Sequence, residues 1–325
     1  MATSGSVDFN ATRDEIILKA FQKTGLIATG ATATSAQNTE GSFWLNGIVK
    51  SWSASLGIPL WAVRYGAIFP QSLTTPHSLS LGPSGGHASR EILHTTLSAD
   101  SASSDTTIDV NSITSFTDLD NIGVELDNGD IHWTTISGAP AAGVITLASG
   151  VSSAATTGNH VWAYTAKIER PMRIVEAWTR DYTDEANLID IPIQIVTPGE
   201  YNMLTNKATE QYPLYLAYEA LHTNGVARYW PGFIDGSKII YFRYHRILED
   251  FDATGDNPDF PQEWILPLTL ELAAQLAWQY GVDKDKLRML RKEADTWYVR
   301  VSQNDYEEGS IQFVPSSMVR DGMRY

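Results

Sequence analysis

The most constraining feature of this chain is a run of 76 residues, Glu91 to Ala166, that contains no lysine and no arginine. Nine acidic residues lie in the same run, which is also rich in Thr, Ser and Ala. Turn signals occur inside it at 127–130 (Asp-Asn-Gly-Asp) and at 138–140 (Gly-Ala-Pro). Because the flanking segments differ in composition, this acidic island predicts a β module that folds separately and is inserted into another domain.

Short apolar and β-branched stretches divide the acidic island into five or six expected strands. The clearest are at 106–110, 122–126, 131–133, 144–147 and 161–164. Strands of this length and number suit a small closed barrel or a sandwich. We therefore predict an inserted β-barrel domain at 91–166.

The segment before the island, 1–90, begins with two helix signals. Thr12 starts a capping box that precedes an apolar helical repeat, and Gly25 ends that repeat. A second helix with an apolar stripe is expected near 35–56. Turn signals and short extended pieces occupy 60–90, so we assign 1–90 to the first part of a helical domain.

A β-rich segment, 167–255, follows the island, and helical periodicity returns at 256–303. Strands are expected at 172–180, 189–195, 214–219 and 239–244, with turns at 228–231 and 235–236. Asp283 is expected to cap the last helix, whose apolar residues are spaced 3-4-3-4. This helical seam, which requires a facing helix, consists of Leu287, Leu290, Ala294, Trp297 and Val301.

Each pair of terminal helices has an apolar stripe without a partner in its own pair. The simplest arrangement is that the two pairs bury each other's stripes. The predicted fold class is therefore α+β: a discontinuous helical bundle formed by N- and C-terminal helices, with an inserted small β-barrel and a second β-rich segment.

Charge and composition exclude several classes of protein. The net charge of −15 argues against a protein that grips nucleic acid phosphates, since such binding needs a basic face. Disulfides, thiolate metal sites and a cysteine nucleophile are excluded because the chain has no cysteine. We see neither a secretory signal nor an apolar run long enough for a membrane helix, and expect a soluble product made in a cytosol.

No constellation of residues in the sequence predicts catalysis. Gly82 to Gly86 fits the nucleophile pattern G-x-S-x-G, but the alternating β–α series that this pattern requires is missing. Asp250 to Asp256 imitates the start of a calcium loop, yet Pro261 occupies the position of the bidentate Glu, so calcium binding there stays open. The seven histidines show no metal-binding spacing. We predict no catalytic residue, no metal and no cofactor, and hence no enzyme.

Several motifs occur in an order that resembles a known family. They are Asp8-Phe9 with Thr12-Arg13-Asp14-Glu15-Ile16-Ile17 through Gly25; Leu45-Asn46-Gly47-Ile48-Val49-Lys50-Ser51-Trp52 with Gly57-Ile58-Pro59-Leu60-Trp61; Arg170-Pro171-Met172-Arg173-Ile174 with Pro192-Ile193 and Tyr201; and Asp256-Asn257-Pro258-Asp259-Phe260-Pro261-Gln262-Glu263-Trp264 with Leu272-Ala273 and Tyr280-Gly281. Together they resemble the head-to-tail adaptor (connector) proteins of tailed phages, whose longer members carry an inserted β-barrel. One departure is Glu210-Gln211-Tyr212, where the family pattern has a Gly-Pro-like turn.

The resemblance implies a structural protein of the virion, located in the neck between capsid and tail and made in the host cytoplasm. Its implied partners are the portal protein, the tail nozzle or other tail proteins, and further copies of itself in a ring of twelve. DNA would pass through the ring only transiently, with acidic side chains keeping it from sticking.

The final segment, 304–325, has no helical period and mixes apolar residues with Pro315 and Gly322. Given the resemblance, we expect an extended C-terminal arm that grips a neighbouring subunit or the portal; the alternative is a tail that binds nothing. The expected anchors are Ile311, Phe313, Val314, Met318, Val319 and Tyr325.

Two other functions remain open at this stage. The β module and the ten Trp residues would also suit a carbohydrate- or receptor-binding tail protein. A peptidoglycan-degrading virion protein is the less favoured alternative, because sequence spacing cannot show two carboxylates facing each other across a sugar.

Overall fold

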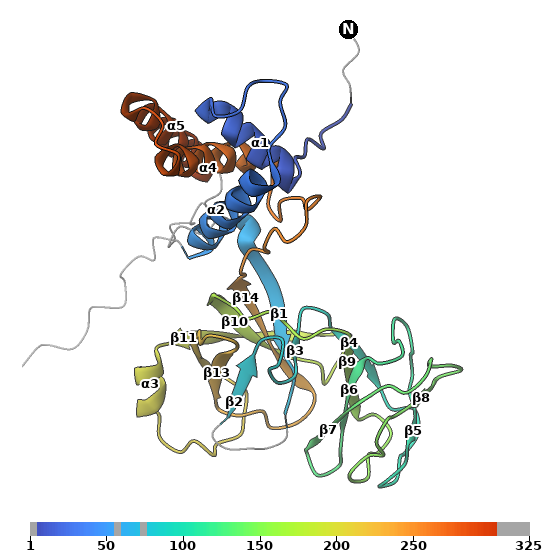
Figure 1. Ribbon diagram of the computed structural model, residues 1–325. Helices are drawn as coiled ribbons and strands as arrows, with labels where there is room; N and C mark the ends of the chain where they lie inside the picture. The colour runs from blue at the N-terminus through green and yellow to red at the C-terminus, as the bar shows by residue number, and fades with distance from the viewer. Residues whose placement is uncertain (1–4, 55–59, 72–76, 304–325) are drawn as a thin grey trace, which may run out of the picture.

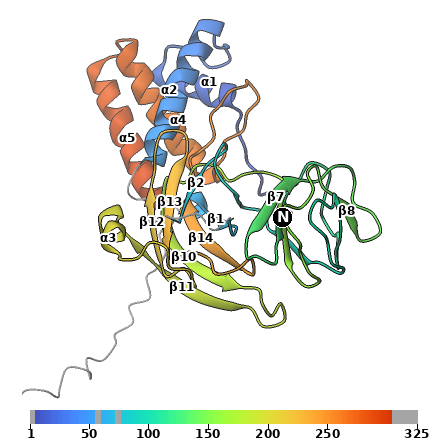
Figure 2. The ribbon, with the colours of Figure 1, turned by 90° about the horizontal axis from the view of Figure 1, so that it is seen from below.

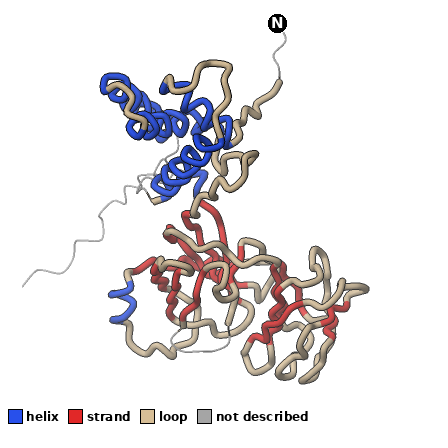
Figure 3. Tube along the Cα trace, in the orientation of Figure 1, coloured by secondary structure: helices blue, strands red, loops and turns tan. Residues whose placement is uncertain are grey.

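The computed structural model describes residues 5–54, 60–71 and 77–303. These residues combine helices with β-sheets, so the fold is mixed α+β, as the sequence predicts. The long helices gather at one end of the molecule and the strands at the other (Figure 3). The short helix α3 (Pro198–Met203) is the exception, because it lies beside the strands.

The helical end is built from both ends of the chain, as the blue and the orange to red helices of Figure 1 show. Its helices are α1 (Arg13–Thr24), α2 (Ser35–Ser53), α4 (Ile265–Gln279) and α5 (Lys284–Ser302). Single-turn helices η1 (Leu60–Ala62) and η2 (Gln262–Trp264) adjoin them. Buried side chains from all four long helices, including Ile17, Leu45, Leu268 and Leu290, form one apolar core.

The helix ends follow from the sequence signals. The Glu15 carboxylate accepts a hydrogen bond from the Thr12 backbone N–H at 2.9 Å, which completes the capping box of α1. Gly25 ends the same helix with a φ of 79°, a left-handed conformation that favours glycine. Asp283 caps α5 by accepting the backbone N–H of Asp285 at 3.0 Å. These three predicted helix boundaries are confirmed.

An eight-stranded sheet lies next to the helices. Its order is β2 (Ser78–Leu81), β13 (Gly225–Trp230), β12 (Tyr215–Glu219), β11 (Ile189–Val196), β10 (Arg173–Asp181), β14 (Lys238–His245), β1 (Val63–Ile68) and β3 (Ala88–Ser89). Its named pairings are antiparallel except β11 with β12, between which α3 lies in the connection. One face of the sheet buries Ile68, Ile174, Leu216 and Phe242 in a core of its own.

Two sequence expectations need correction here. Residues 63–89, which we assigned to the helical domain, contribute strands to the eight-stranded sheet, where Tyr65 pairs with Arg243. Short strands with few alternating residues do not reveal a pairing partner this distant. The turn expected at 228–231 is also wrong, because β13 continues to Trp230, immediately before Pro231. The strand's strict burial alternation outweighs the local turn signal.

Six further strands lie within the acidic island. They are β4 (Leu93–Thr96), β5 (Thr107–Asp109), β6 (Asn121–Glu125), β7 (Ile131–Thr135), β8 (Val144–Thr146) and β9 (His160–Tyr164). One sheet has the order β4-β9-β6-β7, and β5 pairs with β8. Backbone hydrogen bonds join the two sheets on both sides, from Ser98 N–H to Asp109 O and from Ser137 N–H to Thr146 O, each at 2.9 Å. The strands thus follow one another around a closed cycle that encloses an apolar core.

Charged side chains join the helices to the eight-stranded sheet. Arg246, directly after β14, is 4 % exposed and forms an ion pair with Asp259, which lies just before η2. Arg64 on β1 pairs with Glu169 at 3.1 Å and lies 3.7 Å from the same Asp259 carboxylate. Ion pairs from β1 and from the end of β14 therefore meet at Asp259 and link the sheet to the helices.

Candidate functional site

The helical seam lies on α5 with one side toward α4. Leu290 and Ala294 are buried, whereas Leu287, Trp297 and Val301 are half-buried. Leu290 and Leu287 pack into the core that the four long helices share. Other helices of the same chain therefore bury the centre of the seam, and its two ends are partly exposed.

Tyr298 of α5, which the helical spacing did not single out, contacts two tryptophan rings of other elements. The Tyr298 ring lies 5.6 Å from that of Trp52 and 5.5 Å from that of Trp264. Its position, eight residues after Leu290, falls on the apolar side of the helix and was the available signal. The six predicted anchors of the C-terminal arm lie outside the described residues.

An apolar groove lies between α1 and α4. It has a volume of about 560 Å³, with Ile16, Ile265 and Leu266 among its lining residues. Lys19 and Lys23 of α1 also line it, and Phe9 stands beside it with 69 % of its surface exposed. We call it the α1–α4 groove. Sequence periodicity could not reveal it, because it arises where two helices from opposite ends of the chain fail to close over their shared core.

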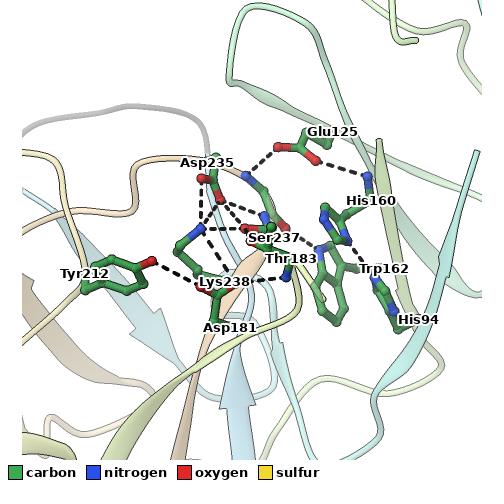
Figure 4. Close-up of polar contacts among 11 residues, drawn as sticks. His94, Glu125, His160, Trp162, Asp181, Thr183, Tyr212, Asp235, Ser237 and Lys238 are labelled. Atoms are coloured by element: carbon green, nitrogen blue, oxygen red, sulfur yellow. Dashed lines mark hydrogen bonds and ion pairs between the residues drawn. The ribbon is translucent and has the colours of Figure 1, made fainter. Parts of the chain in front are cut away.

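A second feature is the junction where the cycle of strands β4–β9 meets the eight-stranded sheet, which lie side by side in Figures 1 and 2. Figure 4 shows its polar contacts. The Trp162 indole N–H donates to the Gly236 carbonyl at 2.8 Å, and Trp162 is completely buried. Glu125 accepts the backbone N–H of His160 at 3.0 Å and that of Gly236 at 2.8 Å. One carboxylate therefore links the two β units directly.

Gly236 fits this junction because it has no side chain. A Cβ at this position would lie 2.7 Å from both the Glu125 carboxyl carbon and Ile131 Cδ1. We expect Gly236→Ala to destabilise the fold by about 1–3 kcal/mol, because the added methyl overpacks the junction. Gly255→Ala is the matched control, since a Cβ there meets nothing within 4 Å. Urea unfolding of both variants measures the effect, and equal stability of the two would contradict it.

Two histidines lie against each other at the junction. His94 Nε2 and His160 Nδ1 are 2.9 Å apart, and His94 Nδ1 lies 3.3 Å from a Glu185 carboxylate oxygen. Burial, aided by the neighbouring His160, lowers the pKa of His94 to about 3. Burial also lowers the pKa of His160, against the opposing effect of Glu125 and other acids. The pair is therefore neutral at pH 7, with one ring donating to the other.

A buried ion cluster completes the junction on the side of the large sheet (Figure 4). Lys238 is 4 % exposed, and its ammonium lies 2.9 Å from an Asp235 carboxylate oxygen and 3.8 Å from one of Asp181. Burial raises the pKa of Asp235, but hydrogen bonds from Ser237 and Lys238 lower it by a larger amount, so the net shift of this pKa is downward. The single buried ammonium is thus paired with two carboxylates of the same chain, which offsets the cost of burying it.

A third histidine joins the junction from the loop before β3. His87 stacks on Trp133 with ring centroids 3.8 Å apart, and its Nδ1 lies 2.8 Å from the Tyr164 hydroxyl. Burial, together with the charge of Lys167, lowers the pKa of His87 to about 4. Phe69 stacks on Tyr164 in the same aromatic cluster. The junction is thus apolar in its centre and bordered by histidines that stay uncharged.

Most acids of the island have a structural task. Seven of the nine accept hydrogen bonds from backbone N–H groups: Glu91 from Thr165, Asp100 from Thr157, Asp105 from Ala102, Asp118 from Gly138, Asp120 from Thr117, Glu125 from His160 and Asp127 from Thr156. Short loops between short strands need such side-chain acceptors. The acidity that marks the island in sequence therefore fixes its turns.

The motifs considered for chemistry have ordinary structural surroundings. In the calcium-like loop, Asp256 accepts the backbone N–H groups of Asp252 and Ala253, and Asp250 pairs with Lys50 at 2.8 Å. Within residues 5–54, 60–71 and 77–303, no cluster of three or more His, Asp or Glu has the arrangement of a metal site. The Ser84 hydroxyl accepts a hydrogen bond from the Asn224 amide in a surface turn. Across the same ranges, no helix combines the length and apolarity needed to cross a membrane.

Comparison with protein-family models and with curated proteins finds no match to this chain. The fold and its surfaces define a mixed α+β protein with an apolar helical groove and a closed, histidine-bordered junction between two β units.

Proposed function

We propose that this chain is a structural head-to-tail adaptor of a tailed-phage virion. Copies of it would form a ring of twelve beneath the portal, connect the portal to the tail nozzle and provide a channel for DNA. In this proposal the helices from both ends of the chain act as one discontinuous bundle, into which the β-barrel at 91–166 is inserted. The protein would be a component of the phage neck without enzymatic activity.

The observation that carries the proposal is the separation of the long helices and the β units at opposite ends of the molecule. The helical end is made from both ends of the chain and has an apolar core of its own, so a subunit could pack beside its neighbours through its helices. The β units extend to the other side of the molecule in Figures 1 and 2. Such a subunit suits a ring in which helices surround a channel and β domains face other tail proteins.

The surface charge supports only transient contact with DNA. The chain carries a net charge of −15, and fixed negative charge repels phosphate. We expect no tight binding of duplex DNA at about 150 mM salt, where long-range attraction is already largely screened. This property is what a channel protein needs if DNA is to pass through without sticking.

Negative-stain microscopy of the purified chain mixed with portal protein tests the proposal. We expect a ring stacked on the portal, and loss of this complex when residues 304–325 are deleted, because the predicted anchors of the arm would be gone. The intact chain alone and the portal alone are the controls. Failure of the intact chain to associate with any portal would contradict the adaptor role, whereas unchanged docking of the shortened chain would contradict the arm.

A carbohydrate- or receptor-binding role is the second candidate, and one surface favours it. On the eight-stranded sheet, Trp178 stacks on Tyr241 with centroids 5.8 Å apart, and the Arg180 guanidinium lies 4.5 Å above Tyr241. Tyr65, 58 % exposed, extends this row of aromatic rings. Flat aromatic surfaces of this kind contact sugars and proteins alike. A trimeric particle that binds glycans through this face would favour the alternative over the ring.

A further inference from the structure

We propose that the α1–α4 groove is the docking site for residues 304–325 of the same chain in the free subunit. The inference goes beyond the proposed adaptor function, because it concerns the isolated chain and holds whichever assembly that chain enters. It would mean that the apolar tail is stored on its own helical end until a partner displaces it. Three observations carry it: the chemistry of the groove, the sequence of the segment and the place where α5 ends.

The chemistry of the groove selects an apolar ligand that also carries negative charge. Leu266 is 40 % exposed and forms part of the apolar lining. Lys19 and Lys23 supply positive charge along the α1 side. The Lys19 ammonium donates to the Gln22 side chain at 3.3 Å and interacts electrostatically with Glu15, which also lines the groove, while that of Lys23 is 3.8 Å from Glu293. Both lysines are exposed, so each can take a further acidic partner. A ligand would therefore gain from burying apolar groups and from placing acids near these lysines.

The sequence of 304–325 has this combination in a suitable order. Three acids, Asp305, Glu307 and Glu308, occur within four residues. After Gly309 and Ser310 come apolar residues, beginning with Ile311 and Phe313. An acidic stretch next to a set of apolar side chains complements an apolar floor bordered by lysines.

The end of α5 brings this segment close to the groove. Four residues before the last residue of α5, Ser302, the Tyr298 ring packs on Trp264 at 5.5 Å. Trp264 directly precedes Ile265, which lines the groove. Seven residues, 304–310, can span up to about 23 Å, enough to place the acids and the first apolar residues at the groove of the same chain. Attachment to that chain also gives an effective concentration on the order of millimolar, which favours it over a second copy.

A designed disulfide tests the proposal directly, because the natural chain has no cysteine. In the full-length double variant Gln262→Cys/Gln312→Cys, we expect mild oxidation to link the two cysteines within one chain. Gln262 is an exposed lining residue, so its replacement does not disturb the core. Non-reducing electrophoresis and mass spectrometry of the oxidised monomer read out the link.

The matched control is Glu263→Cys/Gln312→Cys, whose first cysteine is the next residue along the chain, exposed but outside the groove lining. We expect the Gln262 pair to link about fivefold faster or more, because docking raises the local concentration of the partner thiol. Equal rates in the two variants would overturn the proposal. Predominant links between chains would overturn it as well, by making a second copy the occupant.

A charge reversal tests the role of the lysines. Adding Lys19→Glu to the Gln262→Cys/Gln312→Cys variant should slow linking about two- to fivefold, as expected for an exposed ion pair. Adding Glu307→Lys and Glu308→Lys as well should restore the rate, because the charges are again complementary. Rates that respond to neither change would show that the acids do not face this groove and would contradict the proposed orientation.

Discussion

Replacing Trp264 with alanine is expected to lower the free energy of unfolding by about 3–5 kcal/mol, the usual effect of removing a large buried aromatic side chain. Trp264 is 2 % exposed and lies where α2, α5 and the start of α4 meet. Its ring contacts those of Trp52 and Tyr298 at 5.4 Å and 5.5 Å. Because these partners come from opposite ends of the chain, the substitution should loosen both helix pairs together.

Urea unfolding followed by far-UV circular dichroism measures this effect, and Trp278→Ala is the matched control. Trp278 is also a tryptophan of this C-terminal helical segment, but 66 % of its surface is exposed, so its loss should cost far less. A small effect of Trp264→Ala, similar to that of the control, would show that the two helix pairs do not depend on a common core.

The second large effect is an expected loss of stability in acid, centred on the junction between the β units. The fold keeps His94 neutral with a pKa of about 3, whereas the unfolded chain binds a proton near the ordinary value of 6.5. Below pH 6.5 the unfolded state therefore binds more protons, and stability falls as the pH is lowered toward the folded-state pKa. At pH 5 the loss should be roughly 2 kcal/mol for His94, with a similar contribution from His87, whose pKa is about 4.

The chemistry of the junction gives the direction of this effect a structural cause. Protonation of both His94 and His160 would place two imidazolium groups in contact at 2.9 Å. Glu185 beside His94, and Glu125 and Asp235 near His160, offset one such charge, while Lys238 opposes it. Lowering the pH should therefore separate the two β units at the junction before the rest of the fold unfolds.

Unfolding at pH 7 and pH 5, followed by tryptophan fluorescence and by limited proteolysis near residues 91 and 166, checks the prediction. The variant His94→Gln should have a smaller pH dependence, since one titrating group is removed from the buried pair. His222→Gln is the control, because His222 is exposed on the β12–β13 connection. An unchanged pH dependence in His94→Gln, equal to that of the control, would show that this pair does not couple the β units to pH.

Features of the sequence that act over a few residues predicted much of the fold. The capping box at Thr12, the left-handed Gly25 and the Asp283 cap each depend on a neighbouring turn of backbone, and the structure contains all three. The strand expected at 239–244 and the strands of the acidic island are local in the same sense. These signals hold because hydrogen bonds within a helix turn or across a short loop form between residues that are close along the chain.

The same local signals misplaced residues 63–89 and the turn at 228–231. The pairing of β1 with β14 joins residues far apart in the sequence. The six residues of β1 contain no signal that identifies the strand with which it pairs. Pro231 predicts a turn locally, but a strand can end on the residue before a proline, and β13 does so at Trp230. In both cases the free energy of sheet pairing and burial, which depends on the whole fold, outweighed a short-range preference.

The candidate sites also differ in whether they depend on local sequence signals or on contacts between distant segments. The helical seam was visible as a 3-4-3-4 spacing, because a helix repeats every 3.6 residues whatever its surroundings. The His94–His160 pair, the Glu125 link to Gly236 and the α1–α4 groove were not visible, because each joins residues from separate parts of the chain.

The sequence by itself determined the mixed α+β class, the boundaries of most helices and strands and the position of the acidic island, since these follow from composition and short-range geometry. Only the tertiary structure decided why the island is acidic and how it is attached. Its carboxylates cap turns, and its docking depends on histidines kept neutral by burial, because burial and charge proximity exist only once distant segments are packed together.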